Sequence, residues 1–277
     1  MAEQLVEYFG YPFVRNALVA GVLISLSAAL LGVPLVLKRL SFIGDGLSHV
    51  AFGAMAVAGV LNFADSMALS LPVTIACALV LLKSSRGAKT AGDAMLAMLS
   101  VGAMAVGYLL MNLRPSSSNV SGDVCTTLFG SVSILTLTDF DLWLSVGLSL
   151  GIVVCWLLSY HRLFDVTFDE SYAKACGTNT SLFNAVWAVV VAVVIVMSMR
   201  LVGTLLVTAI LVFPAVSAMR VAKSFRAVTA VAAGFSVACT TLGTLIAVVA
   251  GTPVGSTIVG VDIIGFFMFA ITGRLLK

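Results

Sequence analysis

Long runs of apolar residues follow one another along almost the whole chain, and their length limits what the chain can fold into. They lie near positions 14–37, 44–61, 67–82, 92–112, 139–160, 180–199, 201–219, 227–250 and 256–273. About 20 apolar residues cross the hydrocarbon core of a bilayer as an α-helix. The runs therefore predict an all-α, polytopic membrane helix bundle with about eight or nine transmembrane helices.

The composition excludes a soluble protein. Hydrophobic residues make up 61% of the 277 positions and charged residues only 10%, whereas soluble domains carry about 25% charged residues. Nine spans use roughly 180 residues, so we expect residues 1–277 to form a single membrane domain. The segment Gly87-Ala88-Lys89-Thr90 lacks the glycines of a phosphate-binding loop. Any ATP hydrolysis must therefore come from another chain. The net charge of +3 is too small to suggest a nucleic-acid partner.

The basic residues indicate how the chain is oriented. All of the 15 Lys and Arg residues except Arg15, Arg114 and Arg200 lie in alternate connections or at the C-terminus. Cytoplasmic connections are the ones that carry excess Lys and Arg. This predicts a cytoplasmic C-terminus and, with nine spans, an external N-terminus. The reversal near Met199–Leu201 is the boundary on which this depends, because merging the runs on either side would leave eight spans and bring the N-terminus inside.

Two connections contain more than a simple loop. The external stretch 113–138 includes the apolar run Val124–Leu135, which is too short to cross a bilayer and predicts a re-entrant or interfacial helix. The cytoplasmic stretch 160–180 includes a capping-box pattern, with Thr167 at the N-cap and Glu170 three residues later.

The cytoplasmic stretch therefore predicts a short polar helix. Glu170 and Lys174 have the favourable acid-to-base i, i+4 spacing, and Gly177 can adopt the left-handed conformation that ends a helix. Two interpretations are open: a capped loop helix without a partner, or a docking element for a cytoplasmic subunit.

Ionisable residues inside a span are expensive, so each is a candidate functional residue. Asp45 and His49 lie at i and i+4 and so share one helix face. The structural alternative is a carboxylate that merely satisfies an imidazole. Asp93 can be a path residue or a charge near a helix N-terminus, and Asp262 can be a path residue or the partner of a group that the sequence does not identify.

The Asp45–His49 pair has the chemistry of a metal site. Carboxylate oxygen and imidazole nitrogen both suit zinc, manganese and ferrous iron. Two ligands from one chain would hold a cation weakly, whereas a homodimer with the pair facing its axis would offer four. The many small residues of 44–59 favour close helix approach. We therefore expect a transported divalent cation rather than a permanently bound cofactor.

The sequence also resembles a known family. Lys38–His49 resembles the basic–Met/Leu–Ser–x–x–Gly–Asp–x–x–x–His motif of the membrane permeases of ABC importers for zinc, manganese or iron. Further similarities follow in chain order at Asp93–Leu96, Leu128–Ser131, Leu201–Val207, Phe213–Ala215 and Thr252–Gly255.

This resemblance implies a permease of the type II ABC-importer kind, in the multi-pass plasma (inner) membrane of a bacterium. It implies a homodimer that works with an ABC ATPase subunit and an extracytoplasmic metal-binding protein. Asp45, His49 and Asp93 carry over as metal-path residues. Asp169–Gly177 is similar to the coupling segment that such permeases present to their ATPase, which assigns coupling roles to the residues Asp169, Glu170, Ala173 and Gly177.

The leading function is thus the permease subunit of an ATP-driven importer of divalent metal cations, with zinc and manganese both open. A permease for a chelated metal, such as a siderophore or cobalamin, would need a wider path without a directly coordinating pair. An intramembrane enzyme using Asp45 and His49 would act without an ATPase. A proton-coupled carrier would work without ATP.

Overall fold

The computed structural model describes residues 12–61, 63, 66–84, 89–113 and 139–275, and all regular structure in this part of the chain is helical. The helices are α2 (Pro12–Leu37), α3 (Ile43–Val60), α4 (Met67–Ser84), α5 (Lys89–Leu113), α7 (Asp139–Phe168), α8 (Glu170–Ala175), α9 (Thr180–Val202), α10 (Thr204–Val221), α11 (Phe225–Ala250) and α12 (Val254–Leu275). The predicted all-α fold is confirmed. The predicted helix at Val124–Leu135 lies outside the described residues.

The long helices coincide with the apolar runs of the sequence. Seven of them, α2, α3, α5, α7, α9, α11 and α12, are long and apolar enough to cross a membrane. Two shorter apolar helices, Met67–Leu82 in α4 and Leu206–Val221 in α10, account for the other two runs. Each of the nine predicted spans therefore corresponds to a helix in the described part of the chain.

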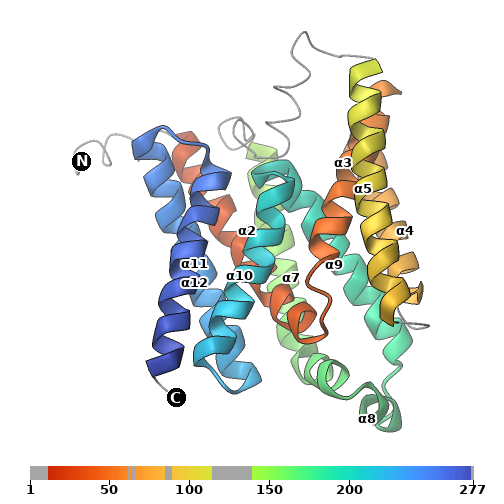
Figure 1. Ribbon diagram of the computed structural model, residues 1–277, viewed down its shortest axis with the longest axis vertical. Coiled ribbons are helices and arrows are strands. Elements are labelled where there is room, and N and C mark those ends of the chain that lie inside the picture. The colour runs from red at the N-terminus through yellow and green to blue at the C-terminus, as the bar shows by residue number, and fades with distance from the viewer. Residues whose placement is uncertain (1–11, 62, 64–65, 85–88, 114–138, 276–277) are drawn as a thin grey trace.

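The reversal between α9 and α10 is a separate turn, and it falls at Gly203. This residue ends α9 and begins α10 with φ of 93°, a value that residues with a Cβ atom rarely adopt. The two helices then run in opposite directions (Figure 1). A single glycine thus divides two apolar runs that composition alone could have joined.

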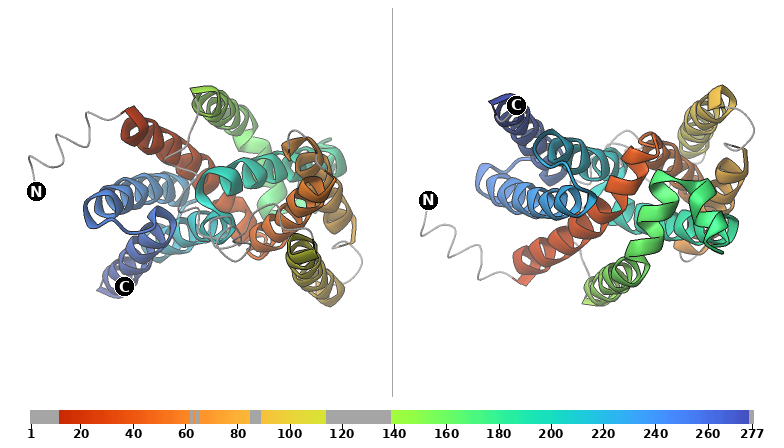
Figure 2. Two further views of the ribbon diagram at one scale, coloured as in Figure 1. Left: turned by 90° about the horizontal axis from the view of Figure 1, so that it is seen from above. Right: turned by 90° about the horizontal axis from the view of Figure 1, so that it is seen from below.

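The helices form two groups joined through the middle of the bundle. In one group α11 packs against α2, α10 and α12, and α10 also packs against α2 and α12. In the other group α3 packs against α4 and α5. Helices α9 and α10 connect the groups, since each also contacts α3. Viewed along the bundle, the blue helices α11 and α12 and the gold helices α4 and α5 lie at opposite ends of an elongated section (Figure 2).

Close backbone contact holds α2 against α10. A Cβ atom at Gly32 would collide with the carbonyl oxygen of Leu211, so the glycine is what allows the two helices to meet. Leu31 is fully buried, and Ser236 of α11 donates a hydrogen bond to the backbone carbonyl of Ser25 at 3.0 Å. Small residues and a buried hydrogen bond are the means by which helices associate where lipid supplies no hydrophobic driving force.

The basic connections gather at one end of the bundle. The turn between α2 and α3, the turn between α10 and α11, helix α8 and the C-terminal end of α12 all lie at the lower end in Figure 1. This arrangement agrees with the predicted alternation of basic connections. The positive-inside rule therefore predicts that this end faces the cytoplasm.

Candidate functional site

Asp45 and His49 lie on the first two turns of α3. Asp45 belongs to the first turn of the helix. One turn later, the Nε2 atom of His49 lies 3.4 Å from the Oδ1 atom of Asp45. The predicted shared face is therefore present, and the two side chains are close enough to bind one ligand together.

The two side chains differ in how far they are buried. The side chain of His49 is 10% exposed and that of Asp45 is 37% exposed. The Nδ1 atom of His49 is buried and has no hydrogen-bond partner in the described part of the chain. A ligating imidazole usually has its second nitrogen fixed by a hydrogen bond. His49 therefore retains unused bonding capacity at Nδ1, and Asp45 is open on its exposed side.

Helix α3 is enclosed by other helices of the same chain. It contacts α5 and α4 most extensively, and it also contacts α10 and α9. Of its residues, Leu47, Ser48 and Ala51 are fully buried. A hydrogen bond of 2.8 Å from the Ser48 hydroxyl to the Asp45 carbonyl satisfies the one polar side chain between the pair. The site is thus inside the bundle of a single protomer.

The small residues of α3 are used against α5. A Cβ atom at Gly53 would lie 2.7 Å from the carbonyl oxygen of Ala103, and one at Gly107 would lie 3.0 Å from the Phe52 ring. A Cβ atom at Gly46 would collide with the side chain of Leu96. The close approach predicted from these residues is confirmed, and the partner is a helix of the same chain. Gly46 and Gly53 are therefore covered by α5 and are not available to a second protomer.

Asp93 lies one turn into α5, and its side chain lies outside the described residues. Its metal role stays a prediction. Within the described residues, no three His, Cys, Asp or Glu side chains are grouped closely enough to hold a metal ion. The described ligands available in one protomer are thus the two of the pair.

Asp262 is separate from the pair. It lies in α12, which packs against α10 and α11, and it is 2% exposed. Its side chain lies beside the thiol of Cys239 in α11, while its Oδ2 atom has no partner in the described part of the chain. The partner that the sequence did not identify is therefore a cysteine.

The short helix α8 is present, but the predicted capping box is wrong. Helix α7 continues through Thr167 to Phe168, and the Thr167 hydroxyl donates to the carbonyl of Leu163 instead of capping α8. The N-cap is Asp169, whose Oδ1 atom accepts hydrogen bonds of 2.9 Å from the backbone N–H groups of Ser171 and Tyr172. An aspartate at this position satisfies N–H groups that the helix leaves unpaired.

Glu170 connects α8 to its own turn and to α9. It forms the predicted ion pair with Lys174 at 3.3 Å. It also accepts a hydrogen bond of 2.9 Å from the hydroxyl of Thr180, the first residue of α9. Glu170 is therefore part of the joint between two helices as well as an exposed charge.

The end of α8 is anchored by Ala173 and Gly177. Ala173 is 1% exposed, so it faces the bundle. Gly177 has φ of 84°, as predicted, and its N–H group donates to Lys174 while that of Thr178 donates to Ala173. These two bonds are those of a Schellman motif. The ends of the helix are thus fixed, and its outer side chains are left exposed.

Sequence analysis missed Asn184. This residue lies in α9, is 9% exposed, and accepts a hydrogen bond of 3.0 Å from the Nζ atom of Lys38 at the end of α2. The bond secures the turn that leads into Asp45. An amide inside an apolar run is a signal that could have identified it.

Residues 10–273 match the sequence profile of the ABC 3 transport family. Because this match covers nearly the whole chain, the protein belongs to that family. It is a membrane-spanning transport subunit, the permease of an ABC transporter in the cell membrane, and not an enzyme. In such systems ATP hydrolysis is carried out by a separate chain.

Individual proteins show the same similarity. The chain is 30% identical over 271 residues to an uncharacterized membrane protein of Synechocystis sp., covering 97% of this chain and 93% of that protein. It is 26% identical to the manganese import system permease protein ScaB of Streptococcus gordonii, covering 93% and 92%. The solved structure of PsaBC from Streptococcus pneumoniae in complex with Fab superposes with a TM-score of 0.84 at 24% identity, covering 97% of this chain and 95% of that one. The fold is therefore shared with that structure.

Proposed function

We propose that the cargo of this permease is a divalent transition-metal cation and that Asp45 and His49 are ligands along its path. The observation that carries this proposal is the pair itself, with Oδ1 and Nε2 3.4 Å apart on a membrane-spanning helix. A carboxylate and an imidazole in an apolar surrounding are costly. Residues that are retained in spite of this cost mark functional sites, and binding of a cation is the function that suits both groups.

A two-ligand site suits transport better than storage. The exposed side of Asp45 gives a cation access to the pair, while the buried Nδ1 atom of His49 has no hydrogen bond to the described residues that would fix the ring. A transported ion has to leave again, so few ligands and incomplete hydrogen bonding are an advantage. Each cation would complete its coordination with water or with groups met later along the path.

Manganese is the cargo that we favour. The ligand set itself suits either zinc or manganese. The relatives that are called manganese import permeases are similar over nearly their whole length, 92% in the case of Streptococcus gordonii ScaB. The proposed order of preference is manganese first and zinc second.

The proposed assembly is a homodimer of this chain with ABC ATPase subunits on the cytoplasmic side and a metal-binding protein outside. Helix α8 is the proposed ATPase docking element, because it is an ordered, capped helix with exposed side chains at the basic end of the bundle. Asp169, Gly177 and the buried Ala173 would hold its shape, while Glu170 would transmit force to α9.

Uptake of radioactive manganese by vesicles containing the complete transporter tests the proposed path. Asp45→Asn keeps the size of the side chain and removes its charge, and His49→Ala removes the imidazole. Loss of a group that merely orients a metal ligand costs about 10–100-fold in affinity or activity, and loss of the ligand itself should cost at least as much. We expect both variants to lose uptake while inserting and assembling normally.

His161→Ala is the matched control, because His161 is the other histidine of the chain and lies exposed near the end of α7. It should transport at the wild-type rate. If Asp45→Asn and His49→Ala also transport manganese and zinc at wild-type rates, the pair is structural. Uptake of a metal chelate in preference to the free ion would reject the proposed cargo.

A further inference from the structure

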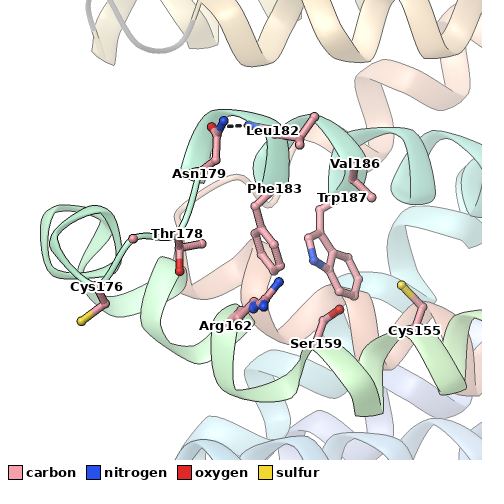
Figure 3. Close-up of a pocket in the computed structure, with 11 residues that line it drawn as sticks. Cys155, Ser159, Arg162, Cys176, Thr178, Asn179, Leu182, Phe183, Val186 and Trp187 are labelled. Atoms are coloured by element: carbon pink, nitrogen blue, oxygen red, sulfur yellow. Dashed lines mark hydrogen bonds between the residues drawn. The ribbon is translucent and has the colours of Figure 1, made fainter.

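A crevice opens between α7 and α9, next to the turn that follows α8. Its volume is about 430 Å³. Arg162 and Ser159 line it from α7, and Phe183 and Trp187 line it from α9 (Figure 3). The volume falls within the range of ordinary ligand sites, and no step of the proposed metal path uses it.

The two ends of the crevice differ in polarity. At its cytoplasmic end lie Arg162 and the polar turn Thr178–Asn179. Further into the membrane it is bordered by Trp187 and by the exposed side chains of Leu182 (63%) and Val186 (49%). Such a site is polar at one end and apolar at the other along the membrane normal.

The depth of Arg162 fits the level of lipid headgroups. The apolar part of α7 runs from Leu142 to Phe168, which is longer than a hydrocarbon core requires, and its outer end is at Leu142. A helix rises 1.5 Å per residue, so about 20 residues cross a hydrocarbon core of about 30 Å. Arg162 is 20 positions beyond Leu142 and therefore lies where the hydrocarbon ends on the basic, cytoplasmic side.

The positive charge of Arg162 is available to a ligand. Its side chain is exposed, and it forms no ion pair with any residue that the structure describes. Figure 3 shows it projecting from α7 toward the Phe183 ring rather than away from the crevice. Basic pockets between membrane helices on the cytoplasmic side are a known means of binding anionic lipid headgroups.

We propose that an acidic phospholipid of the cytoplasmic leaflet binds in this crevice, with its phosphate on Arg162 and its acyl chains along Leu182 and Val186. Charge complementarity favours an anion at one end, and the apolar wall excludes a wholly polar ligand from the other. Thr178 and Asn179 belong both to the crevice and to the link between α8 and α9. The bound lipid would therefore stabilise the position of α8. This proposal depends on which end of the bundle is cytoplasmic and not on the identity of the cargo.

Contact quenching of Trp187 by brominated lipids tests the proposal. Replacing the other two tryptophans, Trp143 and Trp156, with Phe leaves Trp187 as the only tryptophan. The full chain is placed in vesicles of phosphatidylcholine that contain either brominated phosphatidylglycerol or brominated phosphatidylcholine at equal fraction. We expect the brominated phosphatidylglycerol to quench more strongly. Arg162→Gln should weaken this preference about fivefold, the contribution of one interfacial cation.

Lys223→Gln removes a cation of the same cytoplasmic end that does not line the crevice, and it should leave the preference unchanged. Equal quenching by the two lipids, or a preference that survives Arg162→Gln, overturns the proposal. So does reversal of the quenching by inorganic phosphate, which would mean that the site binds free anions. If neither lipid quenches and Leu182→Cys cross-links two copies, a second protomer covers the crevice and the lipid proposal is wrong.

Discussion

Helix α3 is buried on nearly every side by its own chain, whereas α8 lies at the end of the bundle with most of its side chains exposed. Both carry the polar residues that distinguish this protein from a generic membrane bundle. In α3, the buried Nδ1 atom of His49 has no partner among the described residues, and Asp45 is partly open. In α8, Asp169 accepts two hydrogen bonds, and Glu170 contacts both Lys174 and Thr180.

The difference agrees with the roles proposed for the two helices, ion binding for α3 and docking for α8. A group that binds a passing ion needs bonding capacity that the protein does not already occupy. A helix that transmits force needs its ends fixed, because a loose end absorbs displacement. Burying a polar group without a hydrogen bond costs free energy. The buried Nδ1 atom of His49 in α3 carries this cost, whereas the polar groups at the ends of α8 are hydrogen-bonded.

The largest expected effect comes from disturbing the enclosure of α3. Gly53→Leu places side-chain atoms where the carbonyl of Ala103 lies 2.7 Å from the first carbon, and backbone cannot yield as a flexible side chain does. Overpacking typically costs about 1–3 kcal/mol. We expect little folded protein by gel filtration in detergent. Gly59→Leu on the same helix meets nothing within 4 Å and should give the wild-type yield. Equal yields for the two variants would show that the α3–α5 contact is not needed.

The next effect comes from reversing the charge of Glu170. Glu170→Lys removes the acceptor for Thr180 and places two like charges one turn apart. Coupling between sites is typically worth about 5–150-fold, so we expect at least a fivefold loss of ATP-driven uptake with normal membrane insertion. The measurement pairs uptake with co-purification of the ATPase. Normal values of both would reject α8 as the docking element.

A smaller effect is expected at the N-cap of α8. Asp169→Ala removes the side-chain oxygen that accepts both hydrogen bonds of the first turn, which costs about 1 kcal/mol. Hydrogen exchange of the α8 amides should therefore be roughly fivefold faster. Asp169→Asn keeps an acceptor oxygen and should exchange nearly as slowly as the wild type. Identical exchange in the Ala and Asn variants would contradict the capping role.

The smallest effect is expected at Lys174, whose ion pair with Glu170 is exposed. Such pairs contribute about 0.2–1 kcal/mol. Lys174→Met should therefore leave both uptake and ATPase association close to the wild type. A large loss of association would mean that Lys174 contacts the ATPase directly.

The spans could be predicted from the sequence because each one follows from a local property, the length of an apolar run. The shared face of Asp45 and His49 is equally local, since one helical turn determines it. The capping box failed because Thr167 and Asp169 both suit an N-cap, and only the extent of α7 decides between them. The partners Lys38 and Asn184 are 146 positions apart, and no spacing rule connects such residues. The helix that packs against the small residues of α3 could not be predicted either, because it too is determined by tertiary packing.

The length of α7 has a mechanical consequence. The helix runs without a break for 30 residues and contains no proline, and it is followed directly by the capped helix α8. At 1.5 Å per residue it is about 45 Å long, so a tilt of about 5° displaces its far end by about 4 Å. A docked ATPase that pushes on α8 would therefore move a lever that reaches across the whole membrane. A small displacement of the cytoplasmic end of α7 would therefore move its other end, at the opposite face of the membrane, without any helix having to unwind.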